Sequence, residues 1–365
     1  MDLPESFVFR PEPAIEKTPE EESQDAGVRS TFDLGGDLAE ADQNFVGAAA
    51  LQPQPGGAPQ PGGAKPSAPS PPPDPDYTPL NFFLGPHNTP SKWKGKGFNV
   101  IWRPFHKAAS PNQHHFLELN LTDETLTFQK IPGQIPNRGE LQDDLFMVGV
   151  TYLQSISDAN TKSGLHLEPG IWLSVPATTD PLEPKTVVRM ASIPHGTVIN
   201  AQGTPFPTFP GPPPIAPADI TPFTIGNASQ KHPFPESNLS IPTAFRSPPA
   251  DIAGITQQMV DNPNSVLTKA LAGQTVVKTS ATFVVSTDAH PVPGGGIANT
   301  AFLQGTTTGG PNADVPVTTA IFWIEEVKGT GGKPNFFQLQ YTQTVLLNFG
   351  PFSWPHISVA TLVRQ

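Results

Sequence analysis

Hydrophobic and polar residues alternate along much of the chain, and its C-terminal end shows this pattern most clearly. Residues 336–347 (FFQLQYTQTVLL) alternate apolar and polar side chains, and residues 356–364 (HISVATLVR) follow after a turn. A period of two is typical of β-strands. On the last strand, His356, Ser358 and Ala360 share one face. Two small residues on the face of a histidine leave room for a flat ligand beside the imidazole ring.

The same alternation predicts about ten strands along the chain. The predicted strand regions are 93–102, 116–128, 145–156, 165–175, 186–201, 275–287, 297–304, 317–327, 336–347 and 356–364. Region 116–128 alternates on both sides of Asp123 and Glu124 and is interpreted as a hairpin, and regions 165–175 and 186–201 together as two or three strands. Consecutive antiparallel strands in this number predict an all-β, up-and-down β-barrel, because closing the sheet removes its exposed edges. A barrel of this size holds one small ligand.

Segment 204–274 differs from the strand regions and is predicted to be an insertion. Thirteen prolines between residues 204 and 250 argue against regular strands there. Residues 251–274 have the pattern of two short helices, the first capped by Asp251 and the second beginning at Asn262 and Pro263. The second helix is expected to bury Val266, Leu267, Ala270 and Leu271. The last strand also has outward-facing apolar residues that must be shielded from water: Ile357, Val359 and Val363. We expect the insertion to cover them.

Residues 1–80 are predicted to be a disordered tail that precedes the barrel domain, 81–365. Residues 1–43 hold twelve Asp and Glu against three Lys and Arg, which accounts for most of the net charge of −11. Residues 51–76 contain ten Pro and four Gly. Such segments bury too little apolar surface to offset the entropy lost on ordering.

Composition excludes several classes of function. The chain has no cysteine, so disulfides, zinc–thiolate sites, iron–sulfur clusters, thiol nucleophiles and a thiolate haem ligand are all excluded. The acidic balance argues against nucleic acid as a partner. Neither a secretory signal nor an apolar run of membrane-spanning length is present in the sequence, so we expect a soluble, cytoplasmic protein without a membrane partner.

Histidine is the main reactive residue type, and three of the nine histidines stand out. His166 and Glu168 share a strand face and form the only acid–base pair that the pattern offers. His195 lies at a turn between two predicted strands, and His356 opens the last strand. Each also fits a structural histidine that is hydrogen-bonded in the core. A helical zinc motif, His-x-x-His or His-Glu-x-x-His, is absent from the sequence.

The sequence resembles nitrobindin-like haem-binding β-barrels in four segments. These are WKGKG at 93–97, LHLEPGIW at 165–172, VRMASIPHGTVINAQG at 188–203, and the closing pair of strands at 336–365. They are similar to the family's opening W-x-G-x-G strand, its H-x-E-x-G-aromatic-W segment, its A-H-P-T-G turn and its last strand, which begins H-L-x-A-x-L-x-R. The turn departs from the family, because His195 follows the proline here. The pattern is also similar to a longer bacterial and fungal group of haem-binding β-barrel proteins.

This resemblance implies a fatty-acid-binding-protein-like, calycin-like barrel that binds haem b. The family's proximal histidine, which holds the iron, corresponds to His356, and Ser358 and Ala360 leave clearance for the macrocycle. Further expected cofactor contacts are Trp172, Arg189 and His195, with Arg189 or Arg103 pairing a propionate.

The expected ligand of the haem is a small diatomic molecule or a peroxide. Nitric oxide binding, peroxynitrite isomerisation and peroxidase-like chemistry all remain open, with His166 and Glu168 as catalytic residues. Two other classes of function also remain open. In the first, the barrel is a lipocalin-like carrier of a small apolar ligand and binds no haem. In the second, the barrel is a scaffold and the N-terminal tail binds a protein partner.

Overall fold

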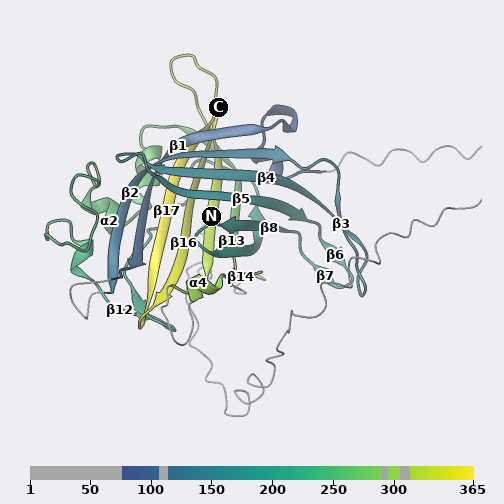
Figure 1. Ribbon diagram of the computed structural model, residues 1–365. Helices are drawn as coiled ribbons and strands as arrows, with labels where there is room; N and C mark the ends of the chain where they lie inside the picture. The colour runs from purple at the N-terminus through teal and green to yellow at the C-terminus, as the bar shows by residue number, and fades with distance from the viewer. Residues whose placement is uncertain (1–75, 107–113, 289–294, 305–312) are drawn as a thin grey trace, which may run out of the picture. The chain divides into compact units, whose positions relative to one another are not determined.

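The computed structural model describes residues 76–106, 114–288, 295–304 and 313–365. Within these residues, ten antiparallel strands close into a barrel, because the last strand pairs with the first (Figure 1). Around the ring the strands are β1 (Ser91–Pro104), β2 (His115–Lys130), β4 (Leu145–Asp158), β5 (Gly164–Val175), β8 (Thr186–Ile193), β9 (Thr197–Phe206), β13 (Val276–Ser286), β15 (Thr318–Val327), β16 (Phe336–Phe349) and β17 (Phe352–Arg364). The prediction of an all-β, up-and-down barrel is confirmed.

Shorter elements decorate the barrel. The short strands are β3 (Ile135–Asn137), β6 (Thr178–Thr179), β7 (Leu182–Glu183), β10 (Phe209–Pro210), β11 (Phe223–Thr224), β12 (Asn227–Lys231) and β14 (Gly296–Asn299). The helices are α2 (Gln257–Asp261), α3 (Ser265–Leu271) and α4 (Ala301–Gln304), with 3-10 turns η2 (Leu80–Phe83), η3 (Pro86–Asn88) and η4 (Pro235–Ser237). In the part of the chain that the structure describes, no helix combines the length and apolar character needed to cross a membrane.

Two strand predictions are wrong. Region 116–128 is one continuous strand, β2, rather than a hairpin. Asp123 points outward to Lys96, 2.8 Å away, while Glu124 points inward to the Tyr341 hydroxyl. The alternation therefore continues through the two acidic residues, because the barrel interior accepts a polar side chain there. Region 297–304 is also not one strand, since it divides into β14 and α4.

One end of the barrel interior is filled with side chains. The Phe83 ring, from η2, lies 4.5 Å from Phe128, 4.7 Å from Phe283 and 5.3 Å from Trp172 between ring centroids. Tyr77 is also buried, and its hydroxyl donates to the backbone carbonyl of Ile131, the residue after β2. The ordered domain therefore begins before the predicted boundary at residue 80. The rest of the predicted tail, residues 1–75, lies outside the described residues.

The barrel closes tightly where β1 meets β17. A Cβ atom on Gly95 would lie 1.9 Å from the Thr361 carbonyl oxygen, and one on Gly97 would lie 2.3 Å from that of Val359. Only glycine permits this approach of the two backbones. The W-x-G-x-G pattern thus has a structural cause, which is the seam of the barrel.

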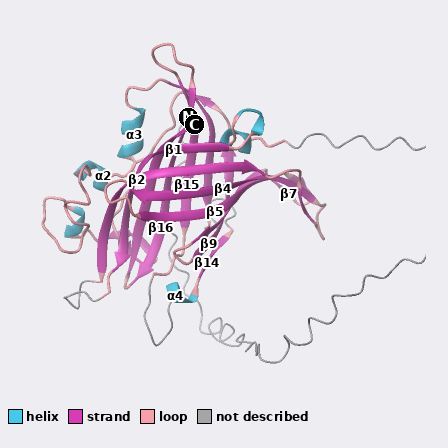
Figure 2. Cartoon of the chain, turned by 45° about the horizontal axis from the view of Figure 1, so that its top comes forward, coloured by secondary structure: helices cyan, strands magenta, loops and turns pink. Residues whose placement is uncertain are grey.

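The insertion packs against the outside of the barrel, over β1, β2 and β17 (Figure 2). Ile357 and Val359 of β17 are buried in one apolar cluster with Val260 of α2 and Leu267 of α3. The expectation that the insertion covers this face is confirmed for these two residues. Their burial explains how an apolar outer face is kept from water.

The helix boundaries in the insertion differ from those predicted. Thr256, rather than Asp251, caps α2, and its hydroxyl accepts from the Met259 backbone N–H. Leu267 is fully buried as expected. The other three predicted core residues of α3 are only half-buried: Val266, Ala270 and Leu271.

Candidate functional site

The other end of the barrel interior contains a cavity of about 360 Å³. Side chains from every barrel strand except β13 line it, and Leu303 of α4 lies among them. The apolar lining includes Ile101, Ile156, Leu165, Ile193, Val315, Val345 and Leu347. Segment 204–274 contributes no residue to the described lining, so the insertion does not cover this site.

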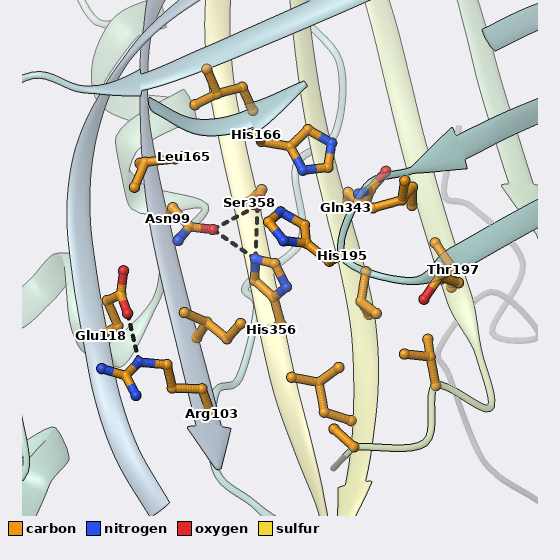
Figure 3. Close-up of a pocket in the computed structure, with 18 of the residues that line it drawn as sticks. Asn99, Arg103, Glu118, Leu165, His166, His195, Thr197, Gln343, His356 and Ser358 are labelled. Atoms are coloured by element: carbon orange, nitrogen blue, oxygen red, sulfur yellow. Dashed lines mark hydrogen bonds and ion pairs between the residues drawn. The ribbon is translucent and has the colours of Figure 1, made fainter. Parts of the chain in front are cut away.

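His356 projects from β17 into this cavity, where it lies beside Asn99 of β1 (Figure 3). Its Nε2 lies 2.7 Å from Asn99 Oδ1, and Ser358 Oγ donates to the same oxygen at 2.9 Å. Barrel closure creates this contact, because β1 and β17 pair Asn99 with Ser358. Among the described residues, Nδ1 of His356 has no hydrogen-bond partner.

A chain of side-chain hydrogen bonds fixes the orientation of Asn99. Its Nδ2 donates to Asn120 Oδ1 at 3.1 Å, and Asn120 Nδ2 donates in turn to the Asp158 carboxylate at 2.9 Å. Since the amide nitrogen of Asn99 is used in this way, its oxygen faces the imidazole. An oxygen only accepts, so Nε2 of His356 carries the proton. Nδ1 is then the nitrogen with a free lone pair.

His356 is held in its neutral form. Burial, together with the nearby His166 and His195, lowers the pKa of His356 to about 3. Burial in a low-dielectric interior disfavours the charged imidazolium, and like charges nearby would add to this effect. At neutral pH the cavity therefore presents an uncharged imidazole, which is the form that binds metal ions.

Three imidazoles gather around the cavity (Figure 3). The rings of His166 and His195 lie 5.3 Å apart between centroids. Burial lowers the pKa of His195, and His166 lowers it further. Within the described residues, no group of three or more His, Asp or Glu side chains is placed to hold a metal ion by itself. The three histidines thus line a ligand site without forming a chelate.

Below the cavity, Glu168 and Arg189 form a buried ion pair of 2.5 Å. Arg189 also donates to the Tyr152 hydroxyl at 3.0 Å and to Gln343 Oε1 at 2.6 Å, so each part of its guanidinium group has a protein acceptor. Burial alone would raise the pKa of Glu168, but Arg189 and the hydrogen bond from His166 hold it at about 2. Glu168 is therefore a fixed carboxylate, and its Oε2 lies 3.1 Å from His166 Nε2.

Four of the eight predicted site residues line the cavity: His166, His195, His356 and Ser358. The others lie deeper in the barrel. Glu168 and Arg189 are paired with each other, Trp172 packs in the filled end, and Ala360 is buried in the same apolar cluster. Arg189 is thus placed away from the cavity lining. Arg103, the alternative propionate partner, does line the cavity and lies 2.7 Å from Glu118.

The sequence did not point to several polar residues of the site. Asn99, Thr122, Glu124, Gln154 and Tyr341 all line the cavity. Each is an inward-facing polar residue within an otherwise alternating strand, and that irregularity is the signal that was available. Their partners are on other strands, so only the closed barrel shows which of them meet.

No family model matches the sequence, and no curated protein matches it. Among solved structures, the chain is similar to the crystal structure of Rv2717c from M. tuberculosis. The two share 13% sequence identity, and the match covers 78% of this chain and 94% of that one with a TM-score of 0.33. At that TM-score the similarity supports no argument about function.

Proposed function

We propose that this protein is a nitrobindin-like haem-binding β-barrel, in which the cavity would take haem b and His356 would hold its iron. The observation that carries the proposal is the state of His356. It is a neutral imidazole on the cavity wall, with Nε2 held by Asn99 and with Nδ1 lacking a hydrogen-bond partner among the described residues. Metal-binding histidines commonly have their other ring N–H held by such an acceptor.

The remaining lining fits this group in chemical terms. The apolar walls suit a large apolar macrocycle, and the small Ser358 side chain stands beside the imidazole on the same face. Arg103 has 38% of its side chain exposed, so it is available to a carboxylate at the cavity rim, although it already pairs with Glu118. A cavity of about 360 Å³ lies toward the small end of the roughly 300–1,000 Å³ usual for ligand pockets. A bound haem would therefore extend beyond the cavity.

Bound haem would supply iron as the site for nitric oxide, peroxynitrite or a peroxide. The chain itself contributes the imidazole of His356, oriented by Asn99, and two further imidazoles. His166 is positioned by the Glu168 carboxylate, which Arg189 holds ionised. The buried apolar cluster at the filled end closes the barrel interior to water from that end.

Two observations favour a second candidate function, which is a carrier of a small apolar ligand. Nε2 of His356 is already satisfied by Asn99, and the cavity is small. In that case the imidazole would donate a structural hydrogen bond, and Nδ1 would be free to accept one from the ligand.

Absorption spectroscopy separates the two candidates. Haem-free protein is titrated with haemin, and the Soret band and binding stoichiometry are recorded. The haem proposal predicts saturation at one haem per chain. Absence of saturable binding, together with an organic ligand detected by native mass spectrometry, would support the carrier instead.

A further inference from the structure

The outer face of strands β4, β5 and β8 concentrates exposed apolar side chains on one side of the barrel. Seven of the ten large apolar side chains that are exposed among the described residues come from residues 141–198. The insertion packs over β1, β2 and β17 and leaves this face exposed. In Figure 1, β4 and β5 lie at the front of the barrel, away from α2 at its left. Apolar side chains that are grouped in this way mark an interaction site, whereas scattered ones do not.

Strand β5 forms the centre of this face. Trp172 points into the filled end of the barrel, so the residues on either side of it point outward. The register places Leu153 of β4 opposite Pro169 of β5. On the other side, Met190 of β8 lies opposite Ile171. Because residues opposite each other share a face, the exposed and half-buried apolar side chains form one patch: Leu153, Leu167, Pro169, Ile171, Leu173, Val188 and Met190.

This face carries no formal charge. Strands β4, β5, β8 and β9 contain only three Asp, Glu, Lys or Arg residues, and all three are buried: Asp158, Glu168 and Arg189. By contrast, three exposed lysines alternate along the outer face of β1. Uncharged polar side chains of β2 and β9 border the patch: Thr127, Gln129, Asn200 and Gln202. An apolar centre without charged residues inside a polar rim is typical of protein–protein interfaces.

The chemistry of this face fits a second copy of the same chain. The barrel is closed, so a partner packs against side chains rather than adding a strand to a free edge. In a two-fold symmetric contact, each face meets an identical face, and a charged face would therefore repel itself. The uncharged face of β4, β5 and β8 meets no such repulsion, and the copy supplies an apolar surface of matching character.

The size of the face also suits a dimer. Strands lie about 4.8 Å apart and rise about 3.3 Å per residue, so the patch with its polar rim has an outline of roughly 20 Å by 25 Å, or about 500 Å². A standard interface buries about 800 Å² of accessible surface on each partner. Accessible surface exceeds a flat outline because side chains project from it, so the patch and its rim supply most of a standard interface.

We propose that the protein forms a homodimer in which the outer faces of β4, β5 and β8 of two copies pack against each other. The two sheets stack face to face at about 10 Å, as in a β-sandwich. This contact lies on the outside of the barrel, so it does not depend on what the cavity binds. Strand β5 also carries His166 into the cavity, so the dimer contact supports the wall from which that imidazole projects.

The oligomeric state of the full-length protein provides the first test. Sedimentation velocity and light scattering are recorded from about 1 μM to about 100 μM, because a dimer dissociates on dilution below its Kd. Twice the mass of the chain is expected at the higher concentrations. The mass of a single chain throughout the range would overturn the proposal.

Leu153→Glu tests whether this face forms the contact. Each copy would then bury a carboxylate without a partner, so the Kd of the dimer is expected to rise by more than about 100-fold. Val277→Glu on β13 is the matched control, because Val277 and Leu153 are both 43% exposed but only Leu153 lies on the face. The Val277→Glu dimer should keep its Kd, and circular dichroism verifies that both variants are folded. A folded Leu153→Glu protein that dimerises like the wild type would overturn the assigned face.

A cysteine placed on the face gives a second measurement that removes no apolar side chain. The chain has no cysteine of its own, so a single substitution reports on one position. Thr151→Cys lies within the face, opposite Ile171, and its alkylation by a maleimide is expected to slow as the protein concentration rises and the dimer forms. Val277→Cys should react at the same rate at every concentration. A rate for Thr151→Cys that is independent of concentration would overturn the proposal.

Discussion

Nε2 of His356 lies 2.7 Å from Oδ1 of Asn99, across the seam where the last strand of the barrel meets the first. Because the Asn99 amide nitrogen donates to Asn120, only its oxygen is available to the imidazole. This single contact fixes the tautomer of His356, in which Nε2 carries the proton and Nδ1 is unprotonated. His356, which would hold the haem iron, is thus oriented by a residue 257 positions earlier in the chain.

Asn99→Leu removes the acceptor that holds the imidazole. We expect haem affinity to fall by about 10–100-fold, because the ring loses its fixed orientation and tautomer. Haemin titration measures this change. The matched control is Ser358→Ala, which removes a neighbouring hydroxyl but keeps the contact between Asn99 and His356. Equal affinities for Asn99→Leu and the wild type would show that the contact does not support the ligand.

Much of the fold follows from local patterns. Alternation predicts the number of strands. The apolar outer face of β17 predicts that another segment, the insertion, packs over it. The hairpin predicted at Asp123 and Glu124 failed for a specific reason. Adjacent acidic residues usually mark a turn, but here one pairs with Lys96 outside and the other with Tyr341 inside. These partners are remote in sequence, so the local pattern carries no sign of them.

Arg189→Met leaves Glu168 as an unpaired charge in the barrel interior. We expect the free energy of unfolding to fall by about 3–5 kcal/mol, because both side chains are buried and the carboxylate would keep only the His166 imidazole beside it. Urea unfolding measures this loss. The double variant Arg189→Met with Glu168→Gln should recover part of the stability. A double variant no more stable than Arg189→Met would contradict the assigned charge pair.

The sequence predicted which residues of a single strand belong to the site, but not the contacts between strands. His166, His195 and His356 were identified from their strand context, and the structure brings them to one cavity. Glu168 was assigned to catalysis because it shares a strand face with His166, and Arg189 was assigned to the cofactor as a partner for a propionate. Their mutual pairing depends on the register between β5 and β8, which places Gly170 opposite Ala191 and so sets the two charges close together. That register comes from the closed barrel.

Glu325 predicts that the stability of the fold decreases as pH rises from about 4.5 to about 8. It is fully buried on β15 beside Gln338, and burial raises its pKa to about 8 from an ordinary 4.5. The pKa of Glu325 is higher in the folded than in the unfolded protein. The neutral side chain therefore contributes its full stabilisation to the fold below about pH 4.5, and this stabilisation is lost as pH rises through about 8. The free energy of unfolding should fall by up to about 1.4 kcal/mol per pH unit over this range.

Glu325→Gln keeps the shape of the side chain and removes its titration. Urea unfolding at several pH values should then show a slope reduced by about one proton relative to the wild type. Glu326→Gln, on the exposed face beside Lys278, is the matched control and should leave the slope largely unchanged. An identical slope in Glu325→Gln and the wild type would refute the assignment.

The most direct test of the haem proposal is the absorption spectrum of His356→Ala after haemin titration. We expect this variant to lose the saturable Soret band of the wild type. His114→Ala, which changes an exposed histidine, should keep that band. Circular dichroism verifies that both variants are folded. A folded His356→Ala protein with an unchanged Soret band and haem affinity would show that His356 does not hold the haem iron.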